Sequence, residues 1–187
     1  ELHPIGSSVG NALQGLAIDV ERDELWMSVD TSSSQENVLI NRLSLKSGNP
    51  QYCEEYTEGN NIALGHGQDL SIEYASNGER WLWIGSESDK GVTRINPQDM
   101  SIEVLSRILP VGFSHSTPAM GLHNQWVAVR GSKDGDSENH DWIRVYEKSA
   151  IESAFVTGNA PSALHEFNID EQQRVSDMWF QGIALDE

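Results

Sequence analysis

Two histidines in the middle of the chain are each followed closely by side chains that donate and accept hydrogen bonds. His66 lies in Gly65-His66-Gly67-Gln68-Asp69, and His115 is followed by Ser116 and Thr117. Imidazole, carboxamide and carboxylate groups that converge on one site can hold a metal ion or bind the hydroxyl groups of a sugar. The alternative is that these groups line a wet channel and bond only to water.

The stretch around His66 belongs to a repeat that would position these side chains. Residues 68–73 (Gln-Asp-Leu-Ser-Ile-Glu) align with residues 14–19 (Gln-Gly-Leu-Ala-Ile-Asp), and residues 181–186 (Gln-Gly-Ile-Ala-Leu-Asp) repeat the pattern again. After residues 68–73 come the turn Ser76-Asn77-Gly78 and the apolar run Trp81-Leu82-Trp83-Ile84. Alternating apolar residues on both sides of such a turn predict a β-hairpin.

The repeats extend to units of four short strands with a period of roughly 50 residues, which is typical of a β-propeller. The expected all-β chain has blades at about 11–58, 62–108 and 113–170, and the first strand of a fourth blade at about 177–187. Residues 148–157 are expected to form a short helical insertion. A two-layer β-sandwich is the alternative, but it does not explain why the glutamine-led segment returns.

In a propeller the first strand of each blade lines the central channel. The alignment places Gln14, Gln68, Thr117 and Gln181 at one equivalent position, with His66 and His115 at one level near the axis. Trp142 follows an acidic loop and is the best candidate for an exposed ring that stacks on a sugar. The predicted ligand-binding residues are therefore Gln14, His66, Gln68, Asp69, His115, Trp142 and Gln181.

Two places could hold a divalent metal such as calcium, the only kind of cofactor that the sequence suggests. The first is the axial pair of histidines, His66 and His115. The second is the loop 134–141, in which Asp134 and Asp136 supply oxygen ligands. This loop begins like a calcium loop but lacks the glycine and the final glutamate of that motif, so a solvated loop is the alternative.

Charge and motifs exclude several classes of function. Twenty-nine acidic residues against twelve basic ones give a net charge of −17, which disfavours nucleic acid and anionic membrane surfaces as partners. No apolar run is long enough to span a membrane. The sequence contains no nucleophile elbow, no His-Glu-x-x-His, no phosphate-binding glycine loop and no Cys-x-x-Cys.

In the segments 13–19, 65–70 and 180–184, the chain resembles the helveticin J-like bacteriocins. It is also similar to the propellers of phage receptor-binding and teichoic-acid-related proteins. The resemblance implies a five-bladed propeller in the parent protein, and a secreted or surface-acting protein that recognises a bacterial cell-wall glycopolymer. Only the stretch Gly65-His66-Gly67-Gln68-Asp69 matches residue by residue.

Three functions follow from these observations. The leading hypothesis is a propeller that binds a carbohydrate or cell-envelope polymer, as part of an antibacterial protein. The alternatives are a hydrolase or lyase with an axial histidine or metal site, and a scaffold for protein partners. Because three blades and one strand cannot close a ring, we expect a second polypeptide or another copy of the chain to supply the remaining blades.

Overall fold

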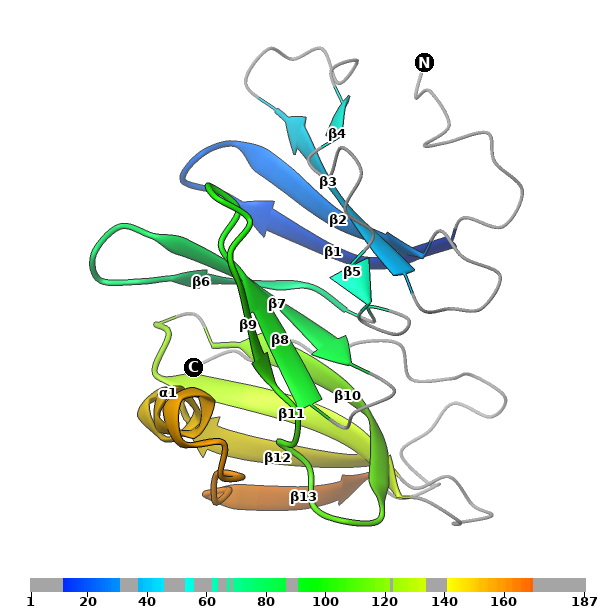
Figure 1. Cartoon of the computed structure of the whole chain (residues 1–187), viewed down its shortest axis with the longest axis vertical. Helices are drawn as coiled ribbons and strands as arrows, with labels where there is room; N and C mark the ends of the chain where they lie inside the picture. The colour runs from blue at the N-terminus through cyan, green and yellow to red at the C-terminus, as the bar shows by residue number, and fades with distance from the viewer. Residues whose placement is uncertain are drawn as a thin grey trace.

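The computed structural model describes residues 12–30, 37–45, 53–55, 62–63, 67, 69–86, 91–121, 123–133 and 141–169. These residues form three antiparallel β-sheets and one helix (Figure 1). Among them, no helix has the length and apolar character needed to cross a membrane. In each sheet the first four strands are hydrogen-bonded in the order in which they occur in the sequence. Each sheet is therefore formed by one continuous segment of the chain.

The strands and the helix have the following bounds. The first sheet contains β1 (Ala12–Asp19), β2 (Glu24–Asp30), β3 (Asn37–Ser44) and β4 (Cys53–Glu55), and the short β5 (Ile62–Ala63) also pairs with β3. The second contains β6 (Ser71–Tyr74), β7 (Arg80–Ser86), β8 (Gly91–Ile95) and β9 (Ile102–Leu105). The third contains β10 (Phe113–Met120), β11 (Trp126–Lys133), β12 (Asp141–Glu147) and β13 (His165–Ile169). Helix α1 (Lys148–Thr157) lies between β12 and β13 and confirms the predicted helical insertion.

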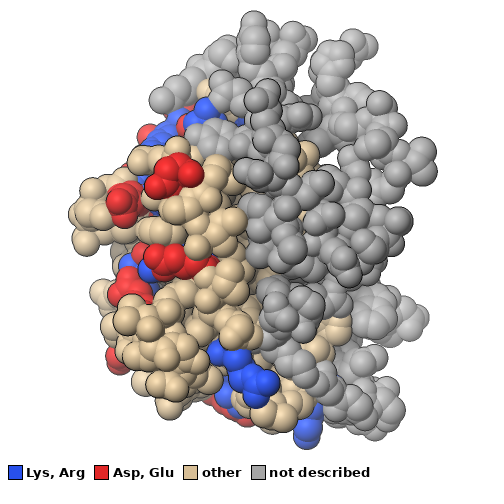
Figure 2. All heavy atoms as spheres, viewed as in Figure 1, with Lys and Arg blue, Asp and Glu red and all other residues tan. Residues whose placement is uncertain are grey.

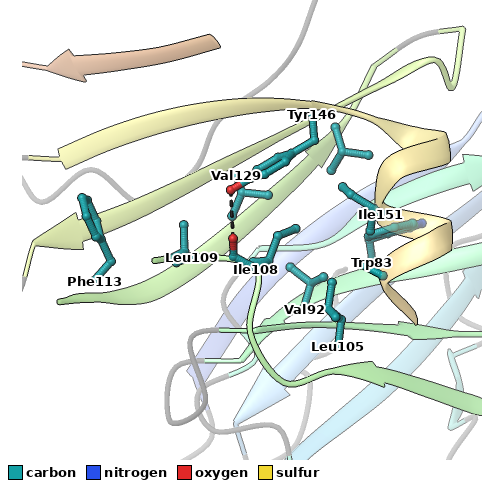
Figure 3. Close-up of a cluster of buried hydrophobic side chains, with 11 residues drawn as sticks. Trp83, Val92, Leu105, Ile108, Leu109, Phe113, Val129, Tyr146 and Ile151 are labelled. Atoms are coloured by element: carbon teal, nitrogen blue, oxygen red, sulfur yellow. Dashed lines mark hydrogen bonds between the residues drawn. The ribbon is translucent and has the colours of Figure 1, made fainter. Parts of the chain in front are cut away.

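Each face of the second sheet packs against a neighbouring sheet. A first core joins the first and second sheets and is made of Trp26, Val38, Ile40, Leu70, Leu82, Ile84 and Ile95. A second core joins the second sheet to the third sheet and α1, and includes Trp83, Val92, Leu105, Val127, Val129 and Ile151 (Figure 3). In that core the buried Tyr146 hydroxyl donates to the carbonyl of Ile108 at 2.9 Å. Three sheets in succession do not fit a two-layer sandwich.

The first strands of the three sheets lie next to each other, since β6 contacts both β1 and β10. The Asp69 amide donates to the Gln14 carbonyl at 3.3 Å, and the Met120 amide donates to the Ser71 hydroxyl at 3.3 Å. A side chain at Gly15 would have its Cβ only 2.5 Å from the carbonyl carbon of Asp69, so the close approach of β1 to the second sheet requires glycine here. This arrangement of three antiparallel sheets around their first strands is consistent with part of a β-propeller. The predicted blade boundaries stay predictions.

The third sheet is offset by one residue from the alignment predicted from the sequence. Met120 pairs with Val127 and packs into the second core, toward the preceding sheet. Ile72 has the same role in the second sheet, because it pairs with Leu82 and packs into the first core. Thr117 is thereby equivalent to Asp69 and not to Gln68, since a shift of one residue along a strand exchanges its two faces.

On the face drawn in Figure 2, the charged side chains of the described residues are dispersed. In the view of Figure 2, the acidic side chains of the described residues lie singly or in small groups among neutral ones, with basic side chains nearby. The acidic groups visible on this face are therefore solvated and screened by salt.

Candidate functional site

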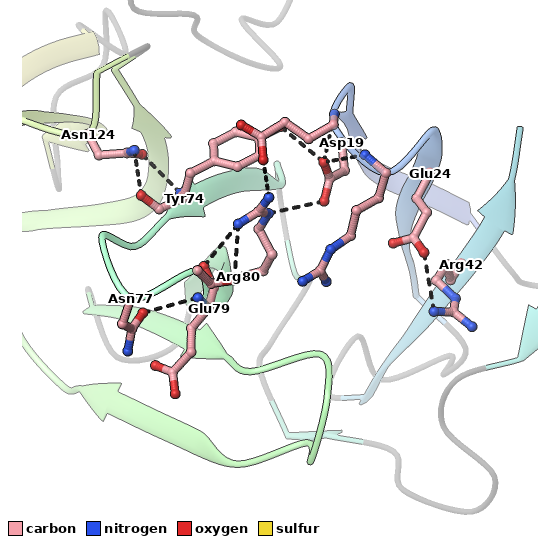
Figure 4. Close-up of polar contacts among 11 residues, drawn as sticks. Asp19, Glu24, Arg42, Tyr74, Asn77, Glu79, Arg80 and Asn124 are labelled. Atoms are coloured by element: carbon pink, nitrogen blue, oxygen red, sulfur yellow. Dashed lines mark hydrogen bonds and ion pairs between the residues drawn. The ribbon is translucent and has the colours of Figure 1, made fainter. Parts of the chain in front are cut away.

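The inner strands β1, β6 and β10 have two ends with different chemistry. Their C-terminal ends are closed by a buried polar network that links all three sheets (Figure 4). The Asp19 carboxylate contacts the Arg80 guanidinium at 3.3 Å and accepts a hydrogen bond from the Tyr74 hydroxyl at 3.4 Å. On its other side, Tyr74 exchanges two backbone hydrogen bonds with the Asn124 side chain, at 3.1 and 2.8 Å.

Each member of this network has a partner, so the network is structural. Asp19 is 1% exposed, and its Oδ1 also accepts the backbone amides of Glu21 and Arg22 in the turn after β1. The Arg80 guanidinium stacks 4.4 Å from the centre of the Tyr74 ring. Burial and the nearby charge of Asp19 raise the pKa of Tyr74 above its ordinary value, so the phenol stays protonated and keeps donating.

Glu73 occupies the position in the second sheet that Asp19 occupies in the first, and it is equally buried. Its Oε2 accepts a hydrogen bond from the Trp83 indole at 2.8 Å and lies 3.8 Å from Arg94, while its Oε1 contacts the Lys148 ammonium at the start of α1. Burial disfavours the charged form of Lys148, but the hydrogen bonds and charges of Glu73 and Glu152 outweigh it and raise the pKa of the ammonium. In both cases a carboxylate at the end of an inner strand pairs with a cation from the following unit: Arg80 of the second sheet pairs with Asp19, and Lys148 of α1 pairs with Glu73.

The N-terminal ends of the inner strands are irregular. Between Leu13 and Gly15 the pairing of β1 with β2 shifts by one residue, so Gln14 lies on a β-bulge. Between Ser114 and Thr117 the pairing of β10 with β11 shifts as well, so His115 and Ser116 lie on a second bulge at the same end. A bulge interrupts the ladder and redirects side chains, and bulges are common beside binding and active sites.

Asp69 and His115 both have a left-handed backbone at these ends, each with φ of 59°. The other described non-glycine residues with positive φ, which are Asp23, Met100 and Asn124, lie in the turns between consecutive strands. The Asp69 carboxylate accepts the amide of Leu70 at 2.9 Å, and His115 Nδ1 lies 3.0 Å from the Ser114 hydroxyl. Both side chains are half-buried. A carboxylate, an imidazole and a carboxamide therefore occupy one end of the inner strands, where they can donate to and accept from a polar ligand.

The structure places some of the predicted site residues and not others. Gln14, Asp69 and His115 lie at the N-terminal ends of the inner strands, which we call the bulged end because β1 and β10 carry their bulges there. His66, Gln68, Gln181, Asp134 and Asp136 lie outside the described residues. Within the described ranges, no three His, Cys, Asp or Glu side chains gather in a group that could hold a metal ion. The ligand and metal roles of all these residues stay predictions.

Trp142 lies apart from the bulged end. It is half-buried, packs against the second core, and meets the Phe113 ring edge-to-face with the ring centres 6.0 Å apart. Part of this ring is therefore used for packing between the second and third sheets, and its contact with a sugar stays a prediction.

The sequence reading did not foresee the carboxylate–cation pairs Asp19–Arg80 and Glu73–Lys148. A signal was present, because each aligned segment ends in an acidic residue. It did not foresee the bulges either, since a bulge depends on the register of two paired strands.

No model of a known protein family matches the sequence, and no curated protein matches it. Among solved structures, the β-propeller domain of Cps50 (Swd1) from Myceliophteria thermophila is similar over 84% of this chain, with 10% identity and a TM-score of 0.42. The tail fibre of Staphylococcus aureus phage P68 is similar over 88% of the chain, with 13% identity and a TM-score of 0.35. The chain spans 41% and 40% of the lengths of those two chains. Similarity at this level indicates neither a ligand nor an activity.

Proposed function

We propose that the chain is part of a β-propeller that recognises a glycan of the bacterial cell envelope, and that the glycan binds at the bulged end. The observation that supports this proposal is that the inner strands of the first and third sheets, on either side of β6, both have a bulge near the end where polar side chains are half-exposed. A left-handed backbone at Asp69 and His115 costs free energy, and such strain tends to persist at binding sites. The opposite end of the same strands is filled by its own ion pairs.

The side chains at the bulged end suit a neutral polyol. The Asp69 carboxylate accepts hydrogen bonds from hydroxyl groups, and Gln14 and His115 can each donate and accept. The net charge of −17 disfavours a strongly anionic polymer, so we propose a neutral glycan as the ligand. A protein with this ligand acts outside the cell, and we propose an extracellular location for it.

A glycan array probed with the 187-residue chain tests the proposal, together with three single variants. Asp69→Asn and His115→Asn remove the charge or the imidazole while keeping a residue that tolerates a left-handed backbone. Asp23→Asn is the matched control, because Asp23 also has a left-handed backbone, with φ of 54°, but lies in the exposed turn after β1.

We expect the chain to bind a neutral envelope glycan, and Asp69→Asn and His115→Asn to weaken that binding at least tenfold. A loss of tenfold corresponds to about 1.4 kcal/mol, the size of one hydrogen bond to a charged group. The Asp23→Asn variant should bind like the unaltered chain. A chain that binds no glycan, or site variants that bind as well as the control, would refute the proposal.

A further inference from the structure

The second sheet ends in an edge strand whose exposed side chains are apolar. This strand, β9, pairs with β8 and is the last strand of its sheet. Ile102 is 43% exposed and Val104 is 55% exposed. Proteins usually protect such an edge with a lysine, a proline or a bulge, because its outward backbone groups pair readily with another strand. Residues 102–105 contain neither lysine nor proline, and their pairing with β8 has no shift of register.

The hydrogen bonds of the β8–β9 hairpin show which backbone groups point outward. The Asn96 amide donates to the Ser101 carbonyl at 2.9 Å, just before β9 begins. In an antiparallel ladder, opposite residues that bond to each other alternate with opposite residues that do not. Ile95 and Ile102, the next pair, are therefore not bonded to each other, and the same holds two residues on for Val104. The amides and carbonyls of Ile102 and Val104 thus point away from β8, and among the described residues no backbone group bonds to them.

The other face of β9 belongs to a cluster of charged groups whose carboxylates are outermost. Because side chains alternate along a strand, Glu103 points away from the face that carries the two exposed apolar side chains. Ion pairs connect the cluster, from Glu103 to Arg94 at 2.6 Å, from Arg94 to Glu73 at 3.8 Å, and through Lys148 to Glu152 at 3.2 Å. The two cations are 13% and 16% exposed, whereas Glu103 and Glu152 are 41% and 47% exposed. A partner that approaches this side of the edge therefore meets carboxylates first.

The charge around β9 favours a basic partner. Asp99 is exposed in the turn that leads into the strand, and the whole chain has a net charge of −17. Negative potential attracts a cationic group and repels another acidic protein. Two copies of this chain joined through β9 would bring their acidic clusters together, and like charges on paired strands are destabilising. The chemistry of the edge is therefore unsuited to self-association.

We propose that β9 binds an extended peptide as a fifth strand of the second sheet, and that this peptide has a basic residue between two apolar ones. The two apolar residues would lie opposite Ile102 and Val104, exchange backbone hydrogen bonds with them, and cover their exposed side chains. The basic residue would lie opposite Glu103 and reach the outer carboxylates of the cluster. This site is separate from the bulged end, which lies on the inner strands of the sheets.

Fluorescence anisotropy of labelled synthetic peptides, titrated with the 187-residue chain, tests the proposal. The probe has blocked ends and the sequence Thr-Val-Lys-Val-Thr. A second peptide carries N-methyl groups on both valines, which removes the amides that would donate to β9. A third peptide has glutamate in place of lysine.

Three variants of the chain complete the experiment. Val104→Pro removes an outward amide of β9 but no bond to β8, a position at which an edge strand tolerates proline. Glu152→Lys reverses the charge of an outer carboxylate. Phe167→Lys is the control, because Phe167 is 53% exposed on β13, which is the edge strand of the third sheet.

We expect the chain to bind the lysine peptide about tenfold more tightly than the N-methylated and glutamate peptides, because each change removes backbone hydrogen bonds or a charge pair. Val104→Pro should weaken binding of the lysine peptide by a similar factor, Glu152→Lys should reduce the preference for lysine over glutamate, and Phe167→Lys should change neither.

Two kinds of result would overturn the proposal. The first is no binding of the lysine peptide, or equal binding of the lysine peptide and either altered peptide, and this comparison does not depend on the folding of any variant. The second is sedimentation of the chain alone as a dimer that Val104→Pro dissociates, because a second copy would then occupy β9.

Discussion

Replacing Lys148 by methionine removes the cation that contacts the buried carboxylate of Glu73, while it keeps a side chain of similar length at the start of α1. Glu73 is 1% exposed, and the substitution leaves it with the Trp83 indole at 2.8 Å and with Arg94 at 3.8 Å. The carboxylate would then be buried with one close hydrogen bond and one distant charge. We expect the native state to lose stability because that charge is no longer well compensated.

The expected magnitude follows from the burial of the pair. Removing one partner of a fully buried ion pair costs about 3–5 kcal/mol. Arg94 compensates part of the charge, and the Lys148 side chain is 16% exposed, so we expect a loss of about 2 kcal/mol. For a chain of this size that loss lowers the melting temperature by about 6 °C.

Urea unfolding followed by tryptophan fluorescence measures this change, since Trp83 bonds directly to Glu73. A double-mutant cycle with Glu73→Gln isolates the pair, and we expect a coupling free energy of about 1–2 kcal/mol. Glu152→Gln is the control, because it removes the more exposed carboxylate that contacts the same ammonium at 3.2 Å, and it should cost only about 0.3 kcal/mol. A coupling below about 0.5 kcal/mol would show that Glu73 and Lys148 do not act as a pair.

Three further predictions follow from single contacts. Gly15→Ala should lower the free energy of unfolding by about 2 kcal/mol in urea unfolding, since its Cβ would clash with the backbone of Asp69; an unchanged midpoint would contradict the close approach of β1 to the second sheet. Thr93→Val should raise that free energy by about 1 kcal/mol, because the Thr93 hydroxyl is fully buried without a hydrogen-bond partner; a destabilised variant would mean that the hydroxyl does bond. The pKa values of Lys148 and Tyr74 are both raised by folding, so their contribution to stability is complete below about pH 10 and is lost as the pH rises through the folded values. Thermal melting from pH 7 to 11 should show that loss, and Tyr74→Phe should make it less steep.

The sequence predicted the order of the strands because the relevant signals are local. Alternating apolar residues and the turn at Ser76-Asn77-Gly78 predict β6 and β7, and the structure confirms this hairpin. The helix at residues 148–157 is confirmed for the same reason, since its bounds depend on a short segment of the chain.

The one-residue offset of the third sheet could not be predicted in this way. The register of β10 depends on its bulge, and the bulge arises from the pairing of β10 with β11 rather than from the residue types of β10 alone. An ungapped sequence alignment does not account for the extra residue that a bulge inserts into one strand. Thr117 was therefore assigned to the wrong equivalent position, while Ile72 and Met120 show the correct one.

The roles of Asp19 and Glu73 show how recurrence should be read in a chain of repeats. A residue that returns in consecutive units serves a contact that each unit makes, and here that contact is an ion pair to the next part of the chain. Binding chemistry is better sought where equivalent positions differ. At the bulged end, the positions of Gly15, Asp69 and Thr117 are equivalent but carry different side chains. Gly15 is fixed by its close approach to Asp69, and Thr117 is fully buried, whereas the Asp69 side chain is half-exposed and can reach a ligand, which is why we place the glycan at this end and not at the acidic end.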